Sequence, residues 1–90
     1  MILRQFCRSP HGRAGVHVLL ERNYGSSLAK LGRLAAAARE TYPNLPDESI
    51  RVKQFGGDQY SGMYGIEFQV EGVTEPPDGY TIIYRLHSTR

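Results

Sequence analysis

Apolar and polar residues alternate with a period of two in two stretches between Ile50 and Val70, and a glycine-rich segment separates them. Such alternation predicts two half-buried strands joined as a β-hairpin. We expect a register with Ile50 opposite Val70 and Lys53 opposite Glu67, because it joins the apolar rows and sets opposite charges across the strands. Residues 57–63 then form the tip of the hairpin.

The same alternation predicts three more strands, over residues 1–7, 15–21 and 80–86. The first two are separated by a short segment rich in turn-forming residues, so we expect them to form a second hairpin. The last strand follows a loop with consecutive prolines and a glycine, which are typical of a β-turn.

Between Ser27 and Thr41 the apolar residues recur at every third or fourth position, which predicts an amphipathic helix. Pro43 ends this helix, because the residue before a proline avoids helical geometry. The expected buried stripe consists of Leu28, Leu31, Ala35, Ala38 and Tyr42, with Leu34 beside it. The expected solvent face carries Lys30, Arg33, Ala37 and Glu40.

The predicted order of elements is β-β-α-β-β-β, within a single compact domain over residues 1–90. The simplest assembly is an α+β fold, in which one antiparallel sheet of four to five strands carries the single helix on one face. The small residues Ala35 and Ala38 should then face the sheet. The face beneath the helix should be the apolar row that includes Ile50, Val52, Ile66, Phe68 and Val70. One helix cannot cover both faces, so the second face, with Arg51, Lys53 and Phe55, is expected to meet water or a partner.

Composition narrows the setting of the protein. The net charge of +2 is small for a protein that coats DNA. The chain has no apolar run long enough to cross a membrane and no pattern of a signal peptide. It has a single cysteine, which cannot form an internal disulfide. Together these features predict a cytoplasmic protein without a membrane partner.

Candidate chemistry is sparse. Cys7 and His17 are expected on the same face of the first hairpin, and a thiolate–imidazole pair can act as a nucleophile or bind zinc. No third orienting residue or further metal ligand accompanies them, so a buried cysteine and a surface histidine are the simpler interpretation. No catalytic, metal-binding or cofactor-binding motif is recognised in the chain. The sequence therefore favours a protein that is not an enzyme and carries no cofactor.

The hairpin tip is the most informative local signal. Six tyrosines occur in the chain, and Tyr60 is the one without an evident place in the core. It lies among glycine, serine, aspartate and glutamine, a composition typical of recognition loops. The alternative is a passive turn whose tyrosine folds back on Phe55. The residues expected to bind a partner are Arg51, Lys53, Phe55, Asp58, Gln59 and Tyr60.

These features favour a small binding protein that acts by occupying the surface of another protein. Small inhibitors encoded by phages and mobile elements, anti-CRISPR proteins among them, share this description as a class-level analogy. One alternative is a nucleic-acid-binding module with a mildly basic loop and sheet face. Its candidate contacts are Arg8, His11, Arg13, Lys30, Arg33 and Arg85, together with Arg51 and Lys53. Homodimerisation through an exposed edge strand is a further possibility.

Overall fold

The computed structural model describes residues 1–8, 15–21, 28–55 and 63–84. Its elements are β1 (Ile2–Cys7), β2 (Val16–Glu21), α1 (Leu28–Thr41), the short 3₁₀ helix η1 (Asp47–Ser49), β3 (Arg51–Phe55), β4 (Met63–Gln69) and β5 (Thr81–Ile83). The predicted order of strands and helix is confirmed, and so is the α+β class. Within these described ranges, no helix has both the length and the apolar character needed to cross a membrane.

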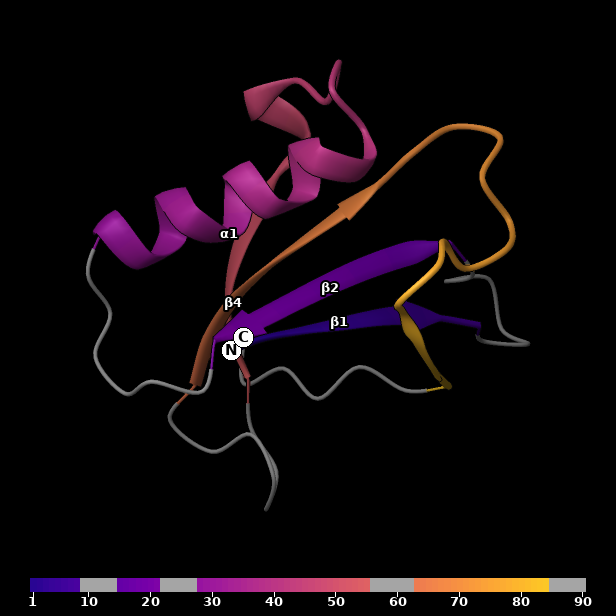
Figure 1. The fold of residues 1–90 in the computed structure, drawn as a ribbon, viewed down its shortest axis with the longest axis horizontal. Coiled ribbons are helices and arrows are strands. Elements are labelled where there is room, and N and C mark those ends of the chain that lie inside the picture. Colours follow the sequence, from indigo (N-terminus) through magenta and orange to yellow (C-terminus); the bar gives the residue numbers. More distant parts are fainter. Residues whose placement is uncertain (9–14, 22–27, 56–62, 85–90) are drawn as a thin grey trace.

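The five strands form one sheet in the order β3-β4-β2-β1-β5 (Figure 1). Every pairing is antiparallel except that of β5, which lies parallel to β1 along its outer edge. The sheet is therefore mixed, because the chain crosses back after β4 instead of turning directly into a neighbouring strand. As the structure describes it, β5 covers three residues and is shorter than the predicted strand.

The register between β3 and β4 differs by two residues from the expected one. Arg51 lies opposite Glu67 and Val52 opposite Ile66. A shift of two residues keeps every side chain on its predicted face, so the face assignment was right and the pairing was wrong. The expected charge pair still forms along a diagonal, with 3.6 Å between Lys53 Nζ and Glu67 Oε1.

The helix α1 packs on one face of the sheet against β2 and β4 (Figure 1). Its buried arc is centred on Leu34 and Ala38, and Leu45 from the following connector packs into the same core. Ala37 belongs to the same core cluster and is only 4% exposed. The expectation that Ala37 faces solvent was wrong, and Ala35 is half-buried rather than central.

The second face of the sheet is not the open surface that we expected. Its centre is a second apolar cluster, formed by Cys7, Val16, Val18, Leu20 and Met63. Every residue of β2 is buried, because this strand is the middle of the sheet and carries apolar residues on both sides. The edge strand β3 is more open on this face: Arg51 is exposed and Lys53 is half-buried. Val52 on the other side of β3 is 56% exposed, so it lies outside the core predicted for it.

The corrected helix face leads to a testable prediction. Replacing Ala38, which is 0% exposed, with phenylalanine should lower the free energy of unfolding by about 1–3 kcal/mol through overpacking. Ala36 is exposed on the same helix, and the same substitution there should change the value by no more than about 0.5 kcal/mol. Urea denaturation of both variants measures the difference. Equal losses at the two positions would show that the helix face is assigned wrongly.

Candidate functional site

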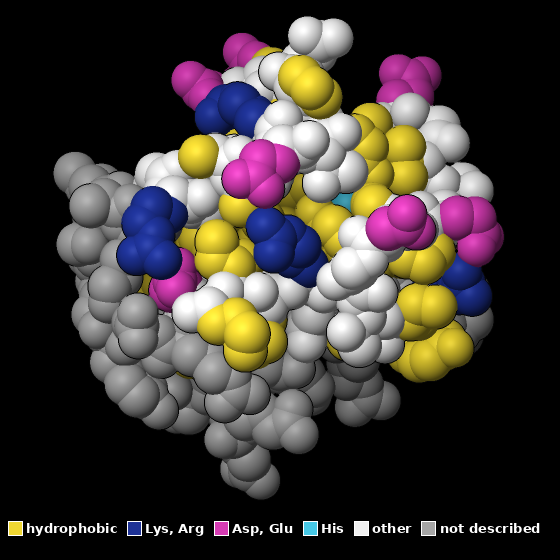
Figure 2. Space-filling view, viewed as in Figure 1, with side chains coloured by type: hydrophobic (Ala, Val, Ile, Leu, Met, Phe, Trp, Pro, Cys, Tyr) yellow, Lys and Arg dark blue, Asp and Glu magenta, His cyan; other side chains and the backbone are white. Residues whose placement is uncertain are grey.

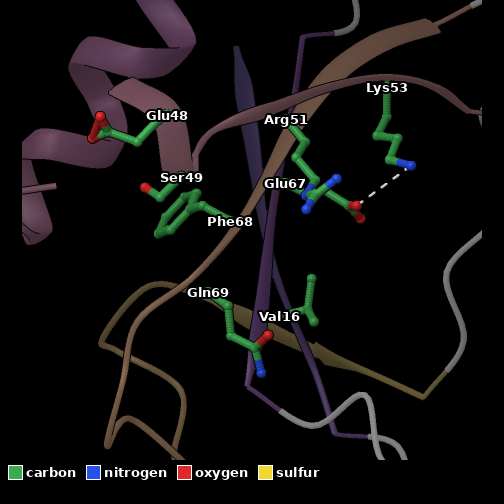
Figure 3. Close-up of a pocket in the computed structure, with 8 residues that line it drawn as sticks. All are labelled: Val16, Glu48, Ser49, Arg51, Lys53, Glu67, Phe68 and Gln69. Carbon is green, nitrogen blue, oxygen red and sulfur yellow. Dashed lines mark ion pairs between the residues drawn. The ribbon is translucent and has the colours of Figure 1, made fainter. Parts of the chain in front are cut away.

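A hollow of about 590 Å³ opens where β3, the end of β4, the start of β2 and η1 come together. It is lined by Val16, Glu48, Ser49, Arg51, Lys53, Glu67, Phe68 and Gln69. Figure 3 shows the two basic side chains beside the carboxylate of Glu67, with the residues of η1 on the opposite side. The hollow therefore has a charged wall on the edge of the sheet, facing η1.

The charged wall follows from strand geometry. Arg51 and Lys53 are two residues apart on β3, so their side chains share one face of the sheet with Glu67 of β4. Glu67 is only 6% exposed, and the ammonium of Lys53 lies 3.6 Å from its carboxylate. A carboxylate withdrawn from water needs such a counter-charge, because an unpaired buried charge is strongly unfavourable. This pair makes the wall a defined polar surface.

Arg51 differs from the other basic side chains that the structure describes. Each of the others lies at ion-pair distance from a carboxylate: Arg4 with Glu40, Arg8 with Glu75, Arg33 with Glu21, Arg39 with Asp47, and Lys53 with Glu67. Arg51 forms no such pair within the described ranges, although it lies cross-strand from Glu67 and is exposed. Its guanidinium is thus available to an external carboxylate or phosphate, which it can bind through two parallel hydrogen bonds.

The ring of Phe68 lies in the core on the helix side of the sheet, next to a buried histidine. It stacks on His17 of β2 with 4.7 Å between ring centroids and 9° between ring planes. The Nε2 atom of His17 lies 2.9 Å from the hydroxyl of Tyr42 at the end of α1. Phe6, Tyr42 and Tyr80 contact the same imidazole edge-on. Burial lowers the pKa of His17, while backbone groups of Phe68 and Gly15 act in the opposite direction.

The proposed pairing of Cys7 with His17 does not occur. Cys7 lies opposite Val16 in the second-face cluster, whereas His17 lies opposite Phe6 on the helix side. Their positions in the hairpin differ by an odd number in the antiparallel register, so the two side chains point to opposite faces. The buried cysteine is confirmed, but the expectation of a surface histidine was wrong. Among the described residues, no cluster of three or more potential metal ligands is present.

The basic residues proposed for nucleic acid are not gathered in one patch where the structure describes them. Arg8 follows β1 and pairs with Glu75 at 2.6 Å, while Arg33 of α1 pairs with Glu21 at 3.3 Å. These arginines lie at opposite ends of the β1–β2 hairpin. On the face shown in Figure 2, basic and acidic side chains lie next to one another. His11, Arg13 and Arg85, and the side chain of Lys30, lie outside the described part.

The protein-binding residues predicted from sequence divide in the same way. The structure brings Arg51 and Lys53 together at the hollow. Asp58, Gln59 and Tyr60, and the side chain of Phe55, lie outside what it describes. The sequence argument missed the other side of the hollow, formed by Glu48, Ser49, Val16 and Gln69. Their proximity depends on the β2–β4 pairing and on the position of η1, which no local pattern reveals.

The chemistry of the hollow is that of recognition. Its wall offers the guanidinium of Arg51, which has no ion-pair partner among the described residues, together with the Lys53–Glu67 pair and the side chain of Gln69. These groups can bind a charged or polar side chain of another molecule. Comparisons with protein-family models, with curated proteins and with solved structures found no match to this chain.

Proposed function

We propose that this protein is a non-catalytic binding module that recognises another protein through the hollow beside β3. The observation that carries the proposal is Arg51, an exposed guanidinium at a concave site with no ion-pair partner in the described part of the chain. By occupying its partner's surface, the module would act as an inhibitor of the kind that phages and mobile elements encode.

The energetics of interfaces support this choice. Arginine is enriched among the few residues that dominate binding, and such residues occur in pockets from which water is expelled. Here the guanidinium extends from a strand, so its position is better defined than on a loop. The neighbouring Lys53–Glu67 pair is already formed and needs no rearrangement to accept a partner. A carboxylate on the partner would form an ion pair with Arg51, which has none among the described residues.

The test begins with capture of the partner from the native host and its identification by mass spectrometry. Replacing Arg51 with alanine should weaken binding by a factor of about 30–1,000, the loss typical of an interface hot spot. Arg8→Ala is the matched control, since it removes the same charge from an arginine already paired with Glu75. Both variants should keep the wild-type melting temperature within a few degrees. Equal affinities of both variants would exclude the hollow as the binding site.

Nucleic acid is the competing outcome of the same experiment. Binding dominated by phosphate contacts would fall steeply with salt and would weaken alike for all sequences when any contacting arginine is removed. We expect instead a shallow salt dependence with the captured protein. Micromolar binding to random oligonucleotides near physiological salt, lost in Arg8→Ala, would overturn the proposal.

Tyr60 is a second expected contact, on the segment that joins β3 to β4. If the tip takes part in recognition, Tyr60→Ala should weaken binding by a comparable factor and leave the melting temperature unchanged. Titration of the captured partner with this variant and with Arg51→Ala locates the contact at the tip, at the hollow, or across both.

A further inference from the structure

The strand that carries Arg51 is an edge of the sheet. β3 pairs with β4 on one side, and the structure describes no strand on its other side. Arg51, Val52 and Gln54 are all exposed along it. An edge strand presents backbone N–H and C=O groups that can pair with a further strand. The open edge therefore adjoins the hollow directly, and both can contact the same partner segment.

The charges on β3 disfavour pairing with a second copy of this chain through the first half of the strand. A two-fold axis normal to the sheet pairs residues of the same face in antiparallel strands. If Lys53 lies on the axis, it faces Lys53 of the other copy; if Val52 lies there, Arg51 faces Lys53. Either register sets like charges directly opposite one another, which is unfavourable. Lysine on an edge strand commonly prevents self-association in this way.

We propose that β3 accepts an extended segment of the partner protein as an additional strand, with acidic side chains on the hollow side and apolar side chains on the other. This inference rests on the proposed function and specifies its mode of recognition. Side chains of an extended segment alternate between faces, so every second one lies beside Arg51 and Lys53. The intervening side chains of the segment lie on the opposite face, beside the exposed Val52. Alternating acidic and apolar residues match both faces of the edge.

Arg51 is the residue that favours an acidic side chain in the partner segment. Lys53 already forms an ion pair with Glu67. A carboxylate from the new strand would therefore pair with the guanidinium of Arg51. Glu48 on the far side of the hollow is also acidic and exposed, which limits how far the partner's negative charge can extend. The preferred segment therefore places its carboxylate over β3 and not over η1.

A synthetic peptide tests this mode directly. The probe has about seven residues, the length of an ordinary strand, alternates glutamate with valine, and is blocked at both ends. Titrated into isotope-labelled protein, it should shift the backbone amide signals of β3 more than those of β1. Arg51→Glu should weaken its binding at least about tenfold, because the change replaces an attraction by a repulsion. The matched control Arg8→Glu should leave it unchanged.

Two modified peptides separate strand addition from simple charge attraction. Methylation of alternate backbone nitrogens on the edge-facing side removes hydrogen-bond donors while keeping every charge, and it should abolish binding. Lysine in place of glutamate should also abolish it. Equal binding of the methylated peptide, or no binding of the parent peptide at millimolar concentration, would overturn strand addition.

The partner protein distinguishes this failure from failure of the proposed function. If Arg51→Ala abolishes binding of the captured partner and the peptide does not compete, the hollow is the site but strand addition is wrong. If the partner binds Arg51→Ala as well as it binds the unchanged protein, both the site and the mode are wrong. Competition by the parent peptide, with none by the methylated one, supports both.

Discussion

Replacing Phe68 with alanine is expected to lower the free energy of unfolding by about 3–5 kcal/mol. The ring is 2% exposed, belongs to the core beneath α1 and stacks on His17. Its removal forfeits the burial of a large apolar group and leaves a cavity that the surrounding strands cannot close. A domain of this size has a total stability of about 5–15 kcal/mol, so the loss is a large share of the whole and should clearly lower the denaturation midpoint.

Urea denaturation followed by circular dichroism measures this loss, and Val52→Ala provides the control. Val52 alternates on the same side of the sheet as Phe68 but is exposed on the edge strand. Its truncation should cost no more than about 0.5 kcal/mol. If the two variants lost the same stability, the core would not extend along β4 as described.

The second large effect is a loss of stability in mild acid that originates from His17. Burial lowers the pKa of this imidazole below its ordinary value near 6.5, so the folded protein resists a proton that the unfolded chain accepts. Above about pH 6.5 the imidazole is neutral in both the folded and the unfolded protein, so the free energy of unfolding is not reduced by His17. As the pH falls below that value, the free energy of unfolding decreases by up to about 1.4 kcal/mol per pH unit, until the pH passes the pKa of His17 in the folded protein.

The variant His17→Gln isolates this effect. It removes the titration and keeps a polar side chain near the Tyr42 hydroxyl. Unfolding free energies measured between about pH 5 and pH 7 avoid most of the titration of carboxylates, whose pKa values lie near 4. The tyrosines around the ring remain neutral there, since burial raises the pKa of both Tyr42 and Tyr80. We expect a clearly shallower slope with pH in the variant. A lower baseline with an unchanged slope would mean that His17 serves packing alone.

Local periodicity predicted which residues form strands and helix, and which side chains share a face. It could not choose the β3–β4 register, because registers that differ by two residues bury the same rows. It also could not predict the parallel position of β5, since a crossover connection leaves no local trace. The exposure of Val52 has the same origin: the alternation of β3 shows a face, but only the strand order shows that this face lies beyond the helix.

The candidate site was predicted less completely than the fold. Arg51 and Lys53 were selected from sequence because they share a face, and the structure places both at the hollow. What sets Arg51 apart is that the other basic side chains in the described ranges are paired, and each of these pairs joins residues from different parts of the fold. Contacts of this kind depend on tertiary structure. The buried position of His17 was missed for the same reason, because an alternating strand does not reveal that both of its faces are covered.

The parallel β1–β5 pairing also determines the order in which the fold can be completed during synthesis. β1 and β2 are adjacent in sequence and can pair as soon as both have left the ribosome, whereas most of the chain separates β1 from β5. Until Thr81–Ile83 emerges, the outer edge of β1 has no strand beside it and can pair with other chains. The nascent protein thus passes through a stage in which a strand of its own core is open to aggregation, and its last strand ends that stage.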